Sequence, residues 1–148
     1  MSDRVPRPAT HSFDEPSDEL RLHVEAPSLE ELFAEAGRAL AELILPNAFR
    51  ADTSLELESA DPELVTIEAT DRDALFADWI NELIFRGETE HRVFVEFRFE
   101  RLTDRHLHAW VRGVELAEPP TPVKAATLHD LYITEYAHGF SVTVTLDV

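Results

Sequence analysis

A strict alternation of apolar and polar residues from Glu19 to Ala26 limits what this chain can fold into more than any other feature. The apolar positions are Leu20, Leu22, Val24 and Ala26, and the polar positions are Glu19, Arg21, His23 and Glu25. A period of two residues is that of a β-strand with one face buried and one face in water. Pro27 ends the strand. Because the apolar face of the strand has to be buried, other elements of the chain must pack against it.

Two amphipathic helices can provide that cover. Ser28 is the predicted N-cap of the first helix, and Glu31, three residues later, completes a capping box. The second helix is predicted from Asp71 to about Arg86, with Gly87 as its end. In both segments the apolar residues recur at helical spacing and form one stripe, which we expect to face the core.

Six further segments show the alternation or the turn signals of strands. They are residues 55–59, 64–69, 93–100, 107–111, 123–133 and 140–148. With the first strand and the helices they predict an α+β fold, a two-layer sandwich in which a mainly antiparallel sheet packs both helices on one face. We expect residues 1–18, which contain several prolines, to be a flexible N-terminal segment, and residues 19–148 to be a single domain.

Composition excludes several functions. The 148 residues include no Cys, so disulfides, thiolate metal sites and cysteine nucleophiles are absent. With 30 acidic and 13 basic residues, the net charge of −17 repels phosphate backbones and favours a basic protein partner or cations, although adaptation to high salt would produce the same excess. We expect no stable binding to nucleic acid. No apolar run is long enough to cross a bilayer and no secretory signal is visible, so we expect a cytoplasmic protein.

Lys124 is the only lysine of the chain, against twelve arginines. Coding bias toward arginine would explain this composition by itself, and a single charged residue is usually solvated surface. Lysine, however, is a compact point charge with a tunable pKa and is not interchangeable with arginine. Because Lys124 falls on a predicted strand, we treat it as a candidate functional residue.

The last two predicted strands place Lys124 near a carboxylate. If they form a tight hairpin, Asp147 faces Leu128 or a near neighbour, Lys124 lies slightly beyond, and both Lys124 and Asp147 project from the polar face. Glu19 would join Asp147 if the first and last strands are neighbours. Two carboxylates with a main-chain carbonyl and water suit Ca²⁺ or Mg²⁺, although such carboxylates are more often solvated charges.

Histidines are the other candidate ligands and bases. Alternation places His129 on the apolar face of its strand, where a hydrogen-bonded core histidine is the ordinary outcome unless a bulge turns it outward. His106 and His108 lie two residues apart on a strand and lack a third ligand at metal-binding spacing. The chain has no glycine-rich phosphate loop and no HExxH motif.

Four stretches of the sequence follow a known pattern: PSLEELF at 27–33, LFADWINELI at 75–84, VKAATLH at 123–129 and LDV at 146–148. They resemble the archease family, small protein partners of the GTP-dependent ligase of tRNA splicing and RNA repair. The first two are amphipathic helix patterns and carry little specificity. The third is close to the family's VKAVTYH, with Leu128 in place of the usual Tyr, and its order before the terminal LDV makes the match specific.

The resemblance implies an accessory protein rather than an enzyme. Archease-like proteins promote guanylylation of the ligase and its repeated turnover, and they do not join RNA themselves. In the family a divalent ion, typically Ca²⁺, is held by an early Asp, by the Asp near the C-terminus and by a backbone oxygen, and a Lys in the third motif is important for function. By resemblance these roles fall on Asp147, the main chain of Val148 and Lys124. Mg²⁺ or Mn²⁺ would suit the same ligands.

The early acid is where this sequence departs from the family pattern. The family has His-Thr-Ala-Asp before the first strand, and an ungapped match places residues 16–19 there, so that Glu19 takes the Asp position. Asp18 is the neighbouring alternative, whereas Asp14, after His11, requires a gap. Glu19 still offers a hard oxygen ligand on a side chain one methylene longer, so the departure bears on ion affinity more than on the fold.

Two other functions stay open at the level of the sequence. In a small metal-dependent hydrolase, Glu19 and Asp147 would hold the ion and His129 would act as the general base, which requires a bound water within about 3 Å of its ring. A chaperone-like scaffold would suppress aggregation independently of Lys124.

Overall fold

The structure is a computed structural model that describes residues 8–15, 19–46, 48–49, 60–116 and 123–148. Its elements are β1 (Thr10–Asp14), β2 (Leu20–Ala26), α1 (Leu29–Ile44), β3 (Glu63–Glu68), α3 (Arg72–Glu90), β4 (Arg92–Leu102), β5 (His106–Glu115), β6 (Ala125–Tyr136) and β7 (Gly139–Asp147). The strand expected at 55–59 lies outside the described residues. β1 lies inside the segment 1–18, where the sequence did not predict a strand.

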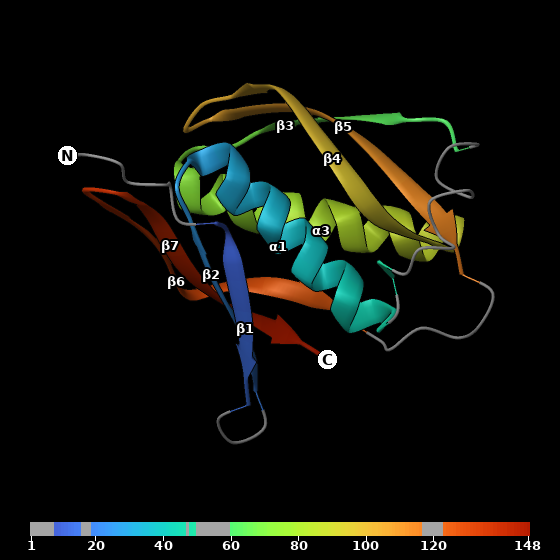
Figure 1. Ribbon diagram of the computed structural model, residues 1–148, viewed down its shortest axis with the longest axis horizontal. Helices are drawn as coiled ribbons and strands as arrows, with labels where there is room; N and C mark the ends of the chain where they lie inside the picture. The colour runs from blue at the N-terminus through green and yellow to red at the C-terminus, as the bar shows by residue number, and fades with distance from the viewer. Residues whose placement is uncertain (1–7, 16–18, 47, 50–59, 117–122) are drawn as a thin grey trace.

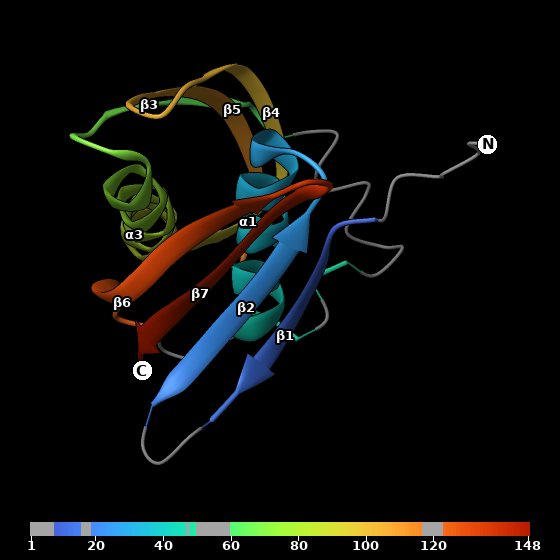
Figure 2. The same ribbon diagram turned by 90° about the vertical axis from the view of Figure 1, so that its left-hand side faces the viewer.

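Within the described residues the strands form two antiparallel sheets, and two helices lie between them (Figure 1). One sheet has the strand order β1-β2-β7-β6 and the other has the order β3-β5-β4. Each helix contacts both sheets, α1 through β2 and β4 and α3 through β6 and β4. The predicted α+β sandwich of antiparallel strands and two helices is confirmed, with the strands divided between two sheets. Figure 2 shows the outer face of the four-stranded sheet, which no described helix covers.

The strand that opens the predicted domain lies in the middle of the four-stranded sheet. β2 pairs antiparallel with β7 along its whole length, and β1 pairs with its other edge. The buried side chains of β2 are Leu20, Leu22, Val24 and Ala26, as alternation predicts. The first strand of the domain and the last are therefore neighbours, which is the condition for Glu19 and Asp147 to meet.

α1 begins where the sequence predicts. The Ser28 hydroxyl accepts a hydrogen bond from the backbone N–H of Glu31 at 3.2 Å, which satisfies one donor of the first turn. Further along, Gly37 lets the helix approach β4 closely. A Cβ at Gly37 would lie 2.6 Å from the ring of Phe97, so a larger residue would push the helix and the sheet apart.

α3 runs past its predicted end. Asp71 caps it as expected, since its carboxylate accepts from the N–H of Ala74 at 2.8 Å. Gly87 lies inside the helix, which ends instead at His91 in the left-handed conformation with a φ of 55°. The missing side chain of Gly87 admits the carbonyl of Arg92, because a Cβ there would lie 2.7 Å from that oxygen. Gly87 thus makes room for the backbone at the start of β4 and does not end the helix.

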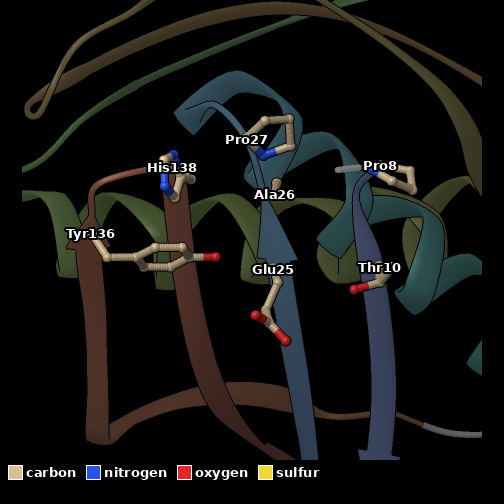
Figure 3. A pocket seen from close by; sticks show the side chains of 7 residues that line it. All are labelled: Pro8, Thr10, Glu25, Ala26, Pro27, Tyr136 and His138. Carbon is tan, nitrogen blue, oxygen red and sulfur yellow. The ribbon is translucent and has the colours of Figure 1, made fainter. Parts of the chain in front are cut away.

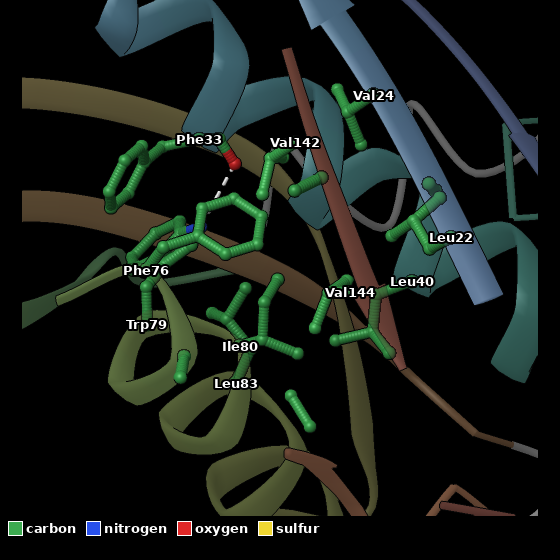
Figure 4. Close-up of a cluster of buried hydrophobic side chains, with 14 of the residues drawn as sticks. Leu22, Val24, Phe33, Leu40, Phe76, Trp79, Ile80, Leu83, Val142 and Val144 are labelled. Atoms are coloured by element: carbon green, nitrogen blue, oxygen red, sulfur yellow. Dashed lines mark hydrogen bonds between the residues drawn. The ribbon is translucent and has the colours of Figure 1, made fainter. Parts of the chain in front are cut away.

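One hydrophobic core joins the helices to both sheets (Figure 4). The indole N–H of Trp79 donates to the backbone carbonyl of Phe33 at 2.9 Å, which links α3 to α1 in the buried interior. Phe76 packs edge-on against Phe33 with 5.1 Å between ring centroids, and Phe99 of β4 lies 5.3 Å from the Trp79 ring. Each such aromatic side chain contributes about 1.5–3 kcal/mol by burial.

A histidine joins β1 to α1. His11 Nδ1 lies 2.6 Å from one oxygen of Glu35, and its Nε2 lies 2.8 Å from the carboxylate of Glu42. Arg38 binds the other oxygen of Glu35 at 2.9 Å. Burial lowers the pKa of His11, but the hydrogen bonds and charges of the two carboxylates outweigh burial, so the pKa is raised above 6.5. Both ring nitrogens donate only in the imidazolium form, so it is the charged ring that bridges strand and helix.

We expect the stability that His11 contributes to fall as pH rises. Because its folded-state pKa is raised, this stability is fully present below the unfolded value of about 6.5 and is lost as pH rises through the folded pKa. His11→Asn cannot take up the proton, so it should lower the free energy of unfolding by about 1 kcal/mol at a pH of about 6 and by less at a pH of about 9. Urea unfolding of both proteins measures the difference. A difference independent of pH would contradict a charged bridge.

Candidate functional site

Glu19 and Asp147 come together at one end of the four-stranded sheet. Leu20 is paired with Leu146 at the end of the register between β2 and β7. Glu19 directly precedes Leu20 and Asp147 directly follows Leu146, so the antiparallel pairing sets the two acids side by side. Both residues are exposed, and Glu19 also lies 3.5 Å from the guanidinium of Arg21. Neighbouring carboxylates are among the ligands that a hard cation takes.

Lys124 lies next to the same acid. Its backbone N–H donates to the backbone carbonyl of Asp147 at 2.7 Å. Its side chain is exposed, and no carboxylate of the described residues forms an ion pair with its ammonium. Val148, the predicted main-chain ligand, follows Asp147 and is 49% exposed. The structure therefore gathers Glu19, Lys124, Asp147 and Val148 at one end of the four-stranded sheet.

β6 contains a bulge that changes its register with β7. Tyr132 is paired with Thr143, but the next registered pair is Thr127 with Thr145, so four residues of β6 face one residue of β7. Asp130, inside the bulge, has a φ of 57°, which is uncommon for a residue other than glycine. An insertion of this kind bends the strand and reverses which of its residues point inward.

The bulge corrects the predicted register of Asp147. A regular hairpin places Asp147 across from Leu128 or a near neighbour, but Asp147 is paired with Ala125. Lys124 therefore lies closer to Asp147 along the sheet than predicted. Because Asp147 is paired with Ala125, the alternation of a strand places Lys124 on the opposite face. Ala126, which was expected on the polar face, is buried with 6% of its surface exposed. The prediction of a common polar face for Lys124 and Asp147 is wrong, whereas their proximity is confirmed.

His129 lies on the outside of the bulge. Its side chain is 77% exposed, and its Nε2 is 3.2 Å from the carboxylate of its neighbour Asp130. The sequence predicts an outward orientation for His129 only if a bulge interrupts the strand, and the structure has that bulge. A general base has to be held against a bound water and substrate, and a ring this exposed is not. The geometry therefore offers the hydrolase interpretation no support.

Asn81 of α3 holds the edge of β6 beside the site. Its Oδ1 accepts from the N–H of Ala126 at 2.7 Å, and its Nδ2 donates to the carbonyl of Ala126 at 3.1 Å. Asp73 accepts from the N–H of Ile133 at 2.9 Å, on the other side of the bulge. These side chains replace the main-chain partners that an edge strand lacks. Sequence reasoning missed Asn81, because nothing in the helix motif that contains it points to a strand about forty residues later.

A hollow of about 490 Å³ lies at the opposite end of the same sheet (Figure 3). The residues that line it are Pro8, Thr10, Glu25, Ala26, Pro27, Tyr136 and His138. Tyr136 ends β6 and His138 lies in the turn that leads to β7, whereas Asp147 lies at the far end of β7. The hollow therefore does not belong to the candidate site, which is an exposed surface.

The donor set suits a hard cation but supplies only part of a coordination shell. Ca²⁺ takes about six to eight oxygen ligands, and carboxylates, main-chain oxygens and water all qualify. Glu19, Asp147 and the main chain of Val148 provide such oxygens. Among the described residues there is no group of three or more His, Asp or Glu side chains able to hold a metal ion. Asp18, the alternative ligand, lies outside the described residues.

Comparison with known proteins decides the family. The model of the Archease protein family matches residues 11–148. The chain belongs to the archease family. The archease of Methanothermobacter thermautotrophicus is 33% identical over 126 residues, which cover 81% of this chain and 85% of that protein. The archease of Methanopyrus kandleri is 31% identical over 122 residues, which cover 76% of this chain and 80% of that protein.

A solved structure shares the fold. The solution structure of protein 1598 of Methanobacterium thermoautotrophicum matches with a TM-score of 0.68 at 28% identity, covering 93% of this chain and 98% of that one. Family membership confirms the resemblance seen in the sequence motifs and supports an archease-type accessory protein. In the part of the chain that the structure describes, no helix is long and apolar enough to span a membrane. The roles of the individual site residues stay predictions.

Asn81→Leu should loosen the strand that carries Lys124. The substitution preserves size but leaves the part-buried N–H and carbonyl of Ala126 without partners, which should lower the free energy of unfolding by about 2 kcal/mol. Hydrogen exchange of the Ala126 amide should become faster, as measured by NMR. Glu88→Gln, at an exposed position of the same helix, is the matched control and should change neither quantity. Unaltered protection of Ala126 in Asn81→Leu would contradict the proposed edge contact.

Proposed function

We propose that this protein promotes guanylylation and multiple turnover of a GTP-dependent RNA-splicing or RNA-repair ligase, and does not join RNA itself. The observation that carries the proposal is that a chain of the archease family brings Glu19, Lys124 and Asp147 together at one exposed end of the four-stranded sheet. The net charge of −17 agrees with action on a protein partner, since such a field repels free RNA.

Lys124 is the residue we expect to contact the ligase or its nucleotide. An ammonium is a point charge with three donors, suited to a phosphate oxygen or a carboxylate. The strand start that carries it is fixed from two sides, by the carbonyl of Asp147 and by the contacts of Asn81 with Ala126. The backbone is thus positioned while the side chain projects into solvent, as a contact with a second protein requires.

The acids are proposed to hold a divalent cation, with Ca²⁺ as the first candidate and Mg²⁺ or Mn²⁺ as alternatives. Glu19 and Asp147 would supply carboxylate oxygens and Val148 a main-chain oxygen, with water completing the shell. When bound, the cation would offset the repulsion of the two neighbouring carboxylates and add positive charge beside Lys124. Such a surface suits the phosphates of a guanylylated ligase.

Lys124→Ala and Asp147→Ala should fold normally and fail to stimulate the ligase. Both side chains are exposed, so their removal costs little packing. Loss of one charge-assisted contact should reduce multiple turnover by about tenfold or more. The measurement is the number of RNA ends joined per molecule of a cognate GTP-dependent ligase, together with guanylylation of that ligase.

Matched controls separate this site from general charge effects. Arg101→Ala and Asp61→Asn remove exposed charges in and next to the three-stranded sheet, so both should stimulate fully. Lys124→Arg should recover only part of the stimulation, because a planar guanidinium does not reproduce a point charge. Full stimulation by both alanine variants would overturn the proposal. Suppression of aggregation that does not need Lys124 would point to a scaffold instead.

Calcium binding is a separate expectation. Titration calorimetry of the wild-type protein should detect a bound Ca²⁺, and Glu19→Gln and Asp147→Asn should each weaken its affinity by about tenfold or more, since each removes an ionised ligand. Asp61→Asn, with its exposed acid in another part of the fold, should bind like the wild type. Equal affinities in all four proteins would exclude Glu19 and Asp147 as ligands without excluding the ligase role of Lys124.

A further inference from the structure

A groove of about 470 Å³ runs between β3 and α3, and its lining does not include Glu19, Lys124 or Asp147. Residues that line it are Thr66, Ile67 and Glu68 of β3 and Asp78, Asn81, Glu82 and Phe85 of α3. Of these, Asn81 also holds the start of β6 beside the candidate site. One wall of the groove is thus a strand, and the other is a helix.

Within the residues that the structure describes, the outer edge of β3 is unpaired. β3 pairs with β5 on one side, and no strand of the described residues lies on its other side. An open edge presents N–H and C=O groups to which another extended chain can add as a strand. The edge of β6 is closed by Asn81 and Asp73, whereas no side chain of the described residues makes such a bond to the backbone of β3.

Phe85 gives the groove an apolar wall. It is 64% exposed, although it lies one turn beyond Glu82 on a helix whose other aromatic residues are buried. Together with Ile67 of β3, this ring gives an incoming chain an apolar surface on which to pack. An added strand would place alternate side chains toward α3 and cover this ring.

The charges of the groove select a basic occupant. Glu82 is bonded to Arg86 at 2.7 Å, but Asp78, one turn earlier, has no hydrogen bond or ion pair with any described residue. Burial raises the pKa of Asp78, although its side chain remains exposed and open to an incoming chain. A Lys or Arg side chain from outside would supply the missing partner, and Glu68 on the facing strand would add to the attraction.

Two other occupants are disfavoured by the same charges. A second copy of the chain that pairs its β3 antiparallel with this one would oppose Glu63 and Glu68, which repel each other. The chain's own residues 51–59 contain three acids and no base, so they would bring further carboxylates toward Asp78. A basic segment of another protein meets neither objection.

We propose that this groove binds an extended, basic segment of a partner protein, which adds as a strand to the open edge of β3. Its main chain pairs with β3, one of its basic side chains pairs with Asp78, and an apolar side chain covers Phe85. The groove shares Asn81 with the support of the candidate site, so variants at its other residues test the two proposals independently.

A defined peptide tests the proposal on the full-length protein. The probe is a fluorescein-labelled decapeptide of alternating Lys and Val, whose binding is followed by fluorescence anisotropy at about 0.15 M salt. Methylation of alternate backbone nitrogens keeps its charge but removes the donors needed for strand addition, so it should weaken binding by about tenfold or more. NMR shifts on binding should be largest at the amides of β3 and the neighbouring turns of α3.

Variants identify the groove as the binding surface. Asp78→Asn and Phe85→Ser, both at exposed positions, should keep the fold and each weaken binding by about fivefold or more. Asp104→Asn and Tyr136→Ser remove a matched charge and a matched aromatic ring elsewhere and should bind like the wild type. Equal affinity for the methylated peptide, or unchanged binding by both groove variants, would overturn the proposal. Either result would mean that the basic peptide binds the acidic protein by nonspecific electrostatic attraction.

Discussion

The hydrogen bond from the Trp79 indole to the Phe33 carbonyl fixes the two helices against each other, and the remaining elements depend on that pair. A buried indole N–H needs an acceptor, so the contact sets the orientation of α3 on α1 as well as their separation. Neither sheet has a core without the helices, because each packs its apolar face on them. The position of the candidate site at the end of β2 and β7 therefore depends on a hydrogen bond in the interior.

Local patterns predicted the elements that depend on near neighbours in the chain. The cap at Ser28, the cap at Asp71 and the buried face of β2 all rest on residues within one or two turns or along one strand. Division of the strands into two sheets depends on pairings between distant segments, which periodicity does not encode. The role of Gly87 was misjudged for the same reason, since the oxygen it admits belongs to the chain returning from the helix.

The sequence predicted which residues of the candidate site lie near one another, but it did not predict the register between β6 and β7. Glu19 and Asp147 follow from one assumption, that the first and last strands of the domain are neighbours, and β2 and β7 are. The bulge in β6 moved Asp147 from Leu128 to Ala125 and turned His129 outward. The bulge also interrupts the alternation of buried and exposed residues in β6. The buried position before it, Ala126, is even-numbered, and the buried position after it, Leu131, is odd-numbered. The ligase partner came from resemblance alone, whereas a divalent ion was also predicted from the two carboxylates, Glu19 and Asp147.

The pairing of β2 with β7 also constrains how the protein is made. His23 and Thr143, which share a hydrogen bond of 2.9 Å, lie 120 residues apart in the sequence. During translation β2 emerges early, and its longest pairing partner does not exist until β7 has been synthesised. The four-stranded sheet therefore has to close last, and in the interval α1 can cover part of the apolar face of β2. Nascent chains stalled before β7 should thus be substrates for chaperones that recognise unpaired strands.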